Sequence, residues 1–134
     1  MRYIVVSMKF EPVVFELART VLALYADQES VSMQAPVSLG MVLRLAIYRG
    51  LEIYETLNPC ATQIDAGRFL KNAGRGARLD KSWQKCTLNL TPAMLERAAR
   101  VGLHRKESRS FALRHLVLLG LPVLIFEARR GVVL

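Results

Sequence analysis

The two halves of the chain repeat one another, and this repeat restricts the fold more than any other feature. The segments MKFEPVVFELA and LNLTPAMLERA match at a spacing of 80 positions, and SLGMVLRLAIYRGL matches the segment that starts at Ser108 at a spacing of 70. The matched pairs are Met8 and Leu88, Phe10 and Leu90, Pro12 and Pro92, Glu16 and Glu96, Ala18 and Ala98, Ser38 and Ser108, Leu43 and Leu113, Arg44 and Arg114, Gly50 and Gly120, and Leu51 and Leu121. The spacing changes between two expected helices, where insertions are tolerated best. We therefore expect one compact domain made of a first unit (1–57), a linker (58–82) and a second unit (83–134).

The second unit has the pattern of a strand followed by two helices. Apolar and polar residues alternate over Lys85–Leu90, as in a strand with one buried face. Thr91 can cap the next helix, and Pro92 suits its first turn, where no backbone N–H is needed. After a basic turn, Ser108 or Ser110 can cap another helix. The expected buried residues are Leu95, Ala98, Ala99 and Leu103 in the first helix, and Leu113, Leu116, Val117, Gly120, Leu121 and Leu124 in the second.

The first unit follows the same order. Because a lone strand cannot stand as a sheet, Tyr3–Phe10 is expected to pair antiparallel with Lys85–Leu90. Apolar residues recur at helical spacing over Pro12–Ala26, and another helix is expected to start near Ser38. The expected inward residues are Ile4, Val6, Met8 and Phe10 in the strand, Val14, Leu17, Ala18, Val21, Leu24 and Tyr25 in the first helix, and Leu43, Ala46, Ile47, Gly50, Leu51 and Tyr54 in the second.

Glycine and proline mark the second helix of each unit. Gly50 and Gly120 occupy matching positions and would let these two helices cross closely. An accidental helix glycine is the alternative reading. Pro122 is expected to kink or end the last helix, after which an apolar tail with Arg129 and Arg130 would cover the first unit or form a dimer contact.

The motifs TLNLTP and SRSFALRHL, taken with the repeat, resemble the ribbon-helix-helix family of DNA-binding proteins, of the MetJ, Arc and CopG type. The resemblance covers most of the chain outside residues 55–83. It implies a mainly α fold with a two-stranded antiparallel ribbon, in which two ribbon-helix-helix units are fused in one chain as an intramolecular pseudodimer. The stretch Ser38-Leu39-x-Met41-x-Leu43-Arg44 and the tandem layout also resemble overdrive-binding accessory proteins of conjugative and T-DNA transfer.

Positive charge is concentrated in the second half of the chain. The formal net charge is +8, with five basic and seven acidic residues in 1–66 but fourteen basic and four acidic residues in 67–134. A basic surface favours a polyanion, either nucleic acid or an anionic membrane, and does not by itself imply sequence specificity. A hydrophobic fraction of 52% over 134 residues is ample for a folded core.

Cysteine and histidine content argues against an enzyme or a metalloprotein. Cys60 and Cys86 form neither a disulfide framework nor a zinc-ligand spacing, which fits a reducing cytosol. His104 and His115 stand in no metal or catalytic-triad spacing, and the glycines at 74–76 lack the strand-to-helix context of a phosphate loop. We expect no catalytic residue, metal site or cofactor.

Membrane insertion and secretion are also not expected. The N-terminal sequence MRYIVVSMKF is interrupted by Ser7 and Lys9 and has no small-residue cleavage site, so it predicts a strand rather than a signal peptide. The apolar run at 116–126 is short against the roughly 20 residues that a bilayer requires. The expected location is the cytoplasm.

The polar face of the ribbon is the candidate for base recognition. A two-stranded ribbon fits the major groove of B-DNA. The expected readers are Val5, Ser7, Lys9, Lys85, Thr87 and Asn89. Asn89 can pair with adenine, Lys9 can donate to guanine, and the hydroxyl residues can do either. On the simpler reading these are ordinary exposed strand residues.

Phosphate contacts are expected elsewhere. The family resemblance places the start of each second helix against a phosphate, where free N–H groups and the helix dipole attract an anion. The expected phosphate-binding residues are Ser38, Arg105, Lys106, Ser108, Arg109 and Ser110, and the expected linker contacts are Arg68, Lys71, Arg75, Arg78 and Lys81. The first unit keeps the serine but has no arginine beside it, so backbone binding is expected mainly from the second unit and linker.

The sequence therefore predicts a cytoplasmic protein that binds double-stranded DNA, acting as an accessory factor in plasmid or T-DNA transfer with other proteins of the transfer machinery as further partners. The chain is expected to be a monomeric pseudodimer, with higher assembly left open. The alternatives are a transcriptional repressor of the same fold, or an interaction scaffold whose first unit has lost DNA binding. We further expect a non-palindromic site, with one half read by the first strand and the other half by the second.

Overall fold

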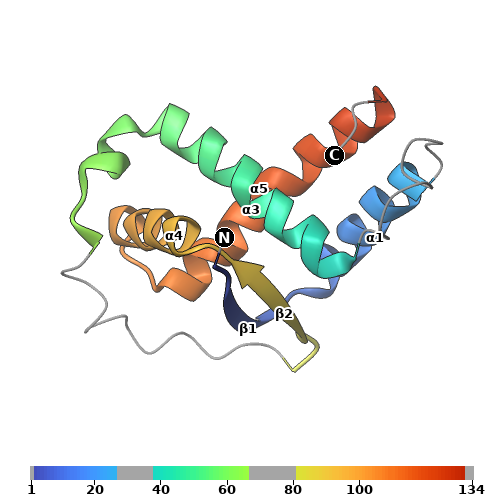
Figure 1. Ribbon diagram of the computed structural model, residues 1–134, viewed down its shortest axis with the longest axis horizontal. Helices are drawn as coiled ribbons and strands as arrows, with labels where there is room; N and C mark the ends of the chain where they lie inside the picture. The colour runs from blue at the N-terminus through green and yellow to red at the C-terminus, as the bar shows by residue number, and fades with distance from the viewer. Residues whose placement is uncertain (1, 27–37, 67–80, 132–134) are drawn as a thin grey trace.

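The fold is that of a computed structural model, which describes residues 2–26, 38–66 and 81–131. In chain order the elements are β1 (Ile4–Phe10), α1 (Pro12–Ala26), α3 (Leu39–Leu57), the short 3-10 helix η1 (Pro59–Gln63), β2 (Gln84–Leu90), α4 (Pro92–Arg105) and α5 (Arg109–Arg129). The described part of the chain is mainly helical, with one two-stranded antiparallel sheet (Figure 1). The expectation of a mainly α fold with an antiparallel ribbon is confirmed at this level.

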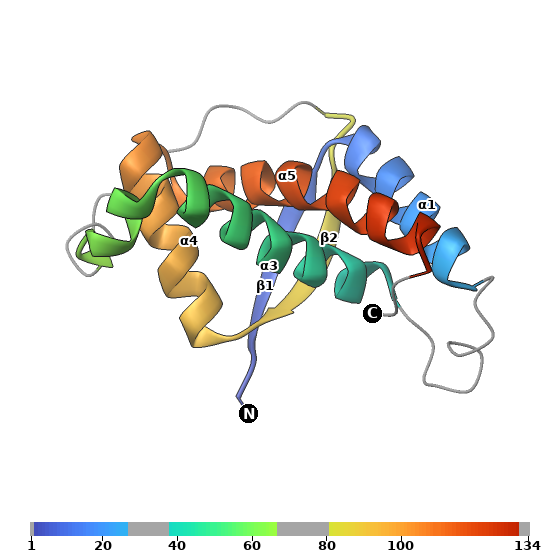
Figure 2. The same ribbon diagram turned by 90° about the horizontal axis from the view of Figure 1, so that it is seen from above.

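The ribbon pairs the first strand of one unit with the first strand of the other. β1 and β2 lie side by side across the long helices (Figure 2), and the register runs from Ile4 opposite Leu90 to Phe10 opposite Gln84. Ser7 stands opposite Thr87 at the centre. The two strands show the same sequence of exposed and buried positions, and the fully enclosed side chains are Met8, Phe10, Leu88 and Leu90. One face of the ribbon is therefore core and the other is solvent.

The inward position expected for Ile4 is wrong. Its side chain is 41% exposed. As the first residue of β1 it borders a surface hollow on α4, together with Pro92 and Leu95, instead of reaching the core. Position along the strand, which alternation alone does not encode, explains the difference.

Serine and threonine side chains start the helices as the sequence predicts. The Met41 backbone N–H donates to Ser38 Oγ, and the Phe111 N–H donates to Ser108 Oγ, both at 3.2 Å. The Met94 N–H donates likewise to the side chain of Thr91. Each bond satisfies a backbone donor that the first turn would leave without a partner. α3 and α5 thus begin with the same cap.

The two longest helices touch backbone to backbone where their glycines lie. A Cβ atom added to Gly50 would overlap the main chain of Leu116, and one added to Gly120 would overlap that of Ala46. Ala46 and Leu116 are themselves 70 positions apart, like the two glycines. The contact is therefore reciprocal, and the predicted close crossing of these helices is confirmed (Figure 2).

α5 continues through Pro122, so the expected end of the helix at this residue, followed by a tail, is wrong. A kink at Pro122 stays a prediction. The helix runs from Arg109 to Arg129 with this proline inside it. The proline is exposed, while Leu121 and Leu124 on either side are buried in the core. Packing of these neighbours outweighs the one backbone donor that proline lacks.

α5 is also the one helix of the described segments that is long and apolar enough to cross a membrane, with a mean hydropathy of 1.8 over its best window. Half of that window is buried inside the protein, where α5 packs against α1, α3 and α4.

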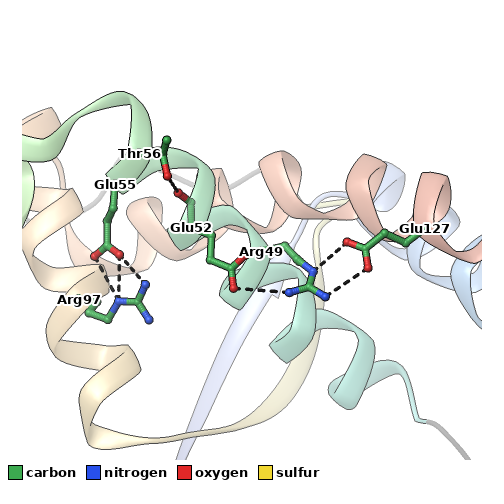
Figure 3. A network of polar contacts seen from close by, with 6 residues as sticks. All are labelled: Arg49, Glu52, Glu55, Thr56, Arg97 and Glu127. Atoms are coloured by element: carbon green, nitrogen blue, oxygen red, sulfur yellow. Dashed lines mark hydrogen bonds and ion pairs between the residues drawn. The ribbon is translucent and has the colours of Figure 1, made fainter. Parts of the chain in front are cut away.

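Ion pairs fasten the helices to one another away from the ribbon. Arg49 on α3 binds Glu127 on α5 through Nε at 2.9 Å and Nη2 at 3.2 Å (Figure 3). Arg97 on α4 forms an ion pair with Glu55 on α3 (Figure 3). In both pairs the arginine is the donor and burial of the carboxylate is substantial. These pairs fix α3 between its two neighbours.

The start of the expected linker is structured. Residues 59–63 form η1, which packs against α3 and α4, and Ala61 is buried. Arg100 Nε donates to the Ile64 carbonyl at 3.1 Å. The connection therefore belongs to the fold up to residue 66.

Candidate nucleic-acid interface

The outer face of the ribbon consists of the six predicted base-reading residues. Val5, Ser7, Lys9, Lys85, Thr87 and Asn89 all lie at exposed positions of β1 and β2. Residues directly opposite in an antiparallel pair point to the same face. The fold thus gathers on one surface six side chains that come from positions about 80 residues apart.

The register sorts these residues by ribbon end, not by strand. Lys9 stands opposite Lys85 at one end, and Val5 stands opposite Asn89 at the other. The expected division, with each strand reading its own half of a site, is therefore wrong. Each end of an antiparallel ribbon contains residues from both strands, and only the register tells which ones.

The lysine pair carries an energetic cost in the free protein. Like charges directly opposite one another destabilise a two-stranded pairing. Within the described part of the chain, neither Lys9 nor Lys85 forms an ion pair. Such a pair becomes favourable when an anion lies between the two ammonium groups.

A polar hollow of about 270 Å³ lies between the start of α3 and β2. Ser38, Arg44, Thr87 and Asn89 line it, with Gly40 and Met41. A Cβ atom on Gly40 would stand 3.2 Å from the Thr87 carbonyl oxygen, so the small residue lets the helix start approach the strand. Arg44 is thus a cation near the start of α3, where the sequence predicts none in the first unit.

Arg44 is not among the predicted site residues. Its guanidinium lies over the ring of Tyr3, with Cζ 5.1 Å from the centroid, and its side chain is only partly buried. The signal for it is present in the sequence, since Arg44 and Arg114 are identical in the repeat. Arg44 is not predicted from the sequence because the resemblance implies an arginine next to Ser38, whereas Arg44 lies further along the helix.

Arg114, the matching residue of the second unit, is buried and has a different role. Its Nε donates to the Lys9 carbonyl at 2.6 Å, and its guanidinium lies over the rings of Phe111 and Trp83. Burial lowers the pKa of the Arg114 guanidinium, although an arginine stays charged at neutral pH. Arg114 thus anchors the backbone from which Lys9 projects.

The start of α5 presents the other predicted phosphate residues unequally. Ser108 uses its hydroxyl oxygen to cap the helix, and Ser110 is exposed. Arg105 Nε binds Glu107 at 2.7 Å, so its charge is partly neutralised. Lys106 is exposed and adopts a left-handed conformation (φ 58°) that ends α4. Arg109 is partly buried and borders the apolar hollow on α4.

Most of the predicted linker contacts fall beyond the ranges that the structure describes. Arg68, Lys71, Arg75 and Arg78 lie outside the described residues, and Lys81 is exposed just before β2. The expected path of these cations along a phosphate backbone stays a prediction.

Polar residues at the far end of α3 form a small cluster apart from the ribbon. Tyr54 hydrogen-bonds His104 Nδ1, and the Cys60 sulfur lies 3.5 Å from His104 Nε2. Burial raises the pKa of the Tyr54 hydroxyl. Within the described ranges no three histidine, cysteine or acidic residues converge as metal ligands. The expectation that the chain is not an enzyme stays a prediction.

Comparison of the chain with protein-family models, with curated proteins and with solved structures gives no match.

Proposed function

We propose that the chain is a ribbon-helix-helix pseudodimer in a single polypeptide. Three pairs of equivalent contacts support this proposal. Ser7 pairs with Thr87, which lies 80 positions away in the repeat. Gly50 contacts Leu116 and Gly120 contacts Ala46, and both pairs of equivalent residues are 70 positions apart, while α3 and α5 start with the same serine cap. A twofold arrangement produces this kind of self-complementary contact, in which residue i meets j and the equivalent of j meets the equivalent of i.

We further propose that this pseudodimer binds double-stranded DNA by inserting the ribbon into the major groove. The observation that carries the proposal is the exposed outer face of the ribbon, which presents two lysines, an asparagine and two hydroxyl side chains from paired strands. These groups match the donors and acceptors on base edges in that groove. Arg44 and Arg109, near the two serine-capped helix starts, would hold the phosphates on either side.

The biological role we favour is an accessory factor in plasmid or T-DNA transfer, in the cytoplasm. It rests on the resemblance of the stretch from Ser38 to Arg44 and on the tandem layout. A transcriptional repressor with the same fold would use the same surface. A protein-interaction scaffold would not need the exposed lysine pair.

The experiment that tests DNA binding is a titration of a mixed-sequence duplex by fluorescence anisotropy across a salt series. Release of counterions from phosphates makes a DNA binder lose affinity steeply and log-linearly with salt. Arg109→Ala should weaken binding to all duplexes alike and flatten the slope by about one unit, because a phosphate contact carries no base information.

Arg129→Ala is the charge-matched control. Arg129 lies in the last turn of α5, whose C-terminal end is well away from the ribbon (Figure 1). It should leave both affinity and slope unchanged. A flat salt series for the wild type would refute DNA binding, and a change of sequence preference alone in Arg109→Ala would refute its phosphate role.

A further inference from the structure

The two ends of the ribbon differ in chemistry. At one end the opposed pair is Lys9 and Lys85, two cations. At the other end the opposed pair is Val5, whose side chain is 67% exposed, and Asn89. Tyr3, exposed by 45% and two positions before Val5, extends the apolar character beside it. Only the central pair, Ser7 and Thr87, presents a hydroxyl from both strands.

We propose that the ribbon recognises an asymmetric DNA site in one fixed orientation, with the lysine end on a G·C step and the asparagine end on an A·T step. This inference rests on the proposed DNA binding. Lysine has three donors and no acceptor, and guanine is the base that shows two acceptors, N7 and O6, in the major groove. Two opposed lysines therefore fit a guanine-rich edge and fit poorly where a donor is displayed.

The opposite end suits an A·T pair. The Asn89 amide has both a donor and an acceptor, which matches N7 and N6–H₂ of adenine. Adenine's partner, thymine, displays a methyl group, and the apolar Val5 side chain across the ribbon can contact it. The central hydroxyls accept or donate equally, so they set no preference.

The ribbon also sets the distance between the two readings. Residues 5 and 9 are four positions apart, which at about 3.4 Å per residue places the two ends about 14 Å from each other. At about 3.4 Å per base step this distance corresponds to about four base pairs. The G·C and A·T preferences should therefore be separated by about that number of positions and lie in a constant order.

Arg114 supports the orientation by holding the lysine end in place. Its bond to the Lys9 carbonyl and its packing on Trp83 tie α5 to the start of β2 and the end of β1. Its match in the first unit, Arg44, lines the hollow beside Asn89. The two units thus give their equivalent arginines different tasks, one inside the fold and one at its surface.

Selection of bound sequences from a pool of random duplexes tests the proposal, with the full-length wild type and three variants. The wild type should enrich a non-palindromic motif with G·C on one side and A·T on the other. Asn89→Ala should lose the A·T preference by roughly 5- to 150-fold and keep the G·C preference. The double variant Lys9→Ala with Lys85→Ala should do the reverse, and Arg129→Ala should leave the motif intact.

Conservative replacements separate recognition from folding. Asn89→Gln keeps an amide that can pair with adenine, and Lys9→Arg keeps donors for guanine, so both should retain the motif. Enrichment of a perfect inverted repeat, or loss of both preferences in Asn89→Ala, would overturn the proposal of an asymmetric site recognised in one orientation. Steep salt dependence without any enriched sequence would also overturn it while leaving DNA binding standing. A flat salt series would instead remove the proposed function itself.

Discussion

At the scale of single residues, identical positions in the repeat have acquired different environments. Arg44 and Arg114 match in sequence, yet one is at the surface and the other is buried under Trp83 and Phe111. The sequence can predict that both residues matter, because both units keep them. It cannot predict which one is buried, because the second ring over Arg114 is that of Phe111, where the first unit has Met41.

His115 shows the same divergence, since leucine stands at the matching position 45. Its imidazole packs edge-on against the Tyr54 ring, with ring centroids 6.2 Å apart. Burial lowers the pKa of His115, the nearby Arg105 lowers it further, and Glu107 opposes the shift. The folded protein therefore resists protonation of this side chain.

We predict that this histidine makes the protein less stable in mild acid. Because the pKa of His115 is lower in the folded state, the unfolded state takes up the proton more readily. The free energy of unfolding is therefore unaffected by this group above the ordinary histidine pKa of about 6.5, and it decreases as the pH falls below that value. Urea unfolding at about pH 7.5 and about pH 5.5 would show a larger loss of stability for wild type than for His115→Leu. Equal losses in the two proteins would contradict the assignment.

At the scale of elements, caps and periodicity predict most of the secondary structure. Ser38, Thr91 and Ser108 start helices as expected, and the strands differ from expectation by one residue at their starts. The expectation that the helix ends at Pro122 is wrong because the effect of a proline depends on what packs around it, and that packing is long-range. The order of the predicted base-reading residues along the ribbon also requires the register, which alternation along a single strand does not contain.

The crossing of α3 and α5 gives the prediction at this scale. In Gly50→Ala the added methyl group would overlap the Leu116 main chain, which cannot move without shifting α5. We expect a loss of about 3 kcal/mol in the free energy of unfolding, at the upper end for overpacking. Thermal or urea unfolding would measure it.

Gly40→Ala is the matched control, because it makes the same change near the start of the same helix. Its Cβ would stand 3.2 Å from the Thr87 carbonyl oxygen, a tight but adjustable contact, and alanine favours helix by up to about 1 kcal/mol over glycine. Its stability should stay close to wild type. A similar loss in both variants would show that helix glycines are needed for some reason other than the crossing.

At the scale of the whole molecule, neither unit encloses a core alone. The sheet takes one strand from each unit, and α5 packs against helices of both units. We predict that residues 83–134, prepared alone, either remain unfolded or dimerise through β2. Sedimentation and circular dichroism would distinguish these states, and a stably folded monomer would contradict the shared core.

The sequence indicates the candidate site as a set of exposed ribbon positions, because the repeat aligns the two strands with each other. What it does not supply is the grouping of those positions: the opposition of Lys9 to Lys85, and the hollow that brings Arg44 beside Asn89. Both are contacts between segments more than 40 residues apart, and no local pattern encodes them.

The pairing of β1 with β2 inside one polypeptide also removes an equilibrium. A ribbon assembled from two separate chains falls apart on dilution, so its occupancy of DNA depends on the square of the chain concentration. Here the second strand is always present at the effective concentration that the covalent connection sets. We therefore predict that the proposed DNA binding follows a simple hyperbola down to the lowest protein concentrations, so that each molecule is as competent at low copy number as at high.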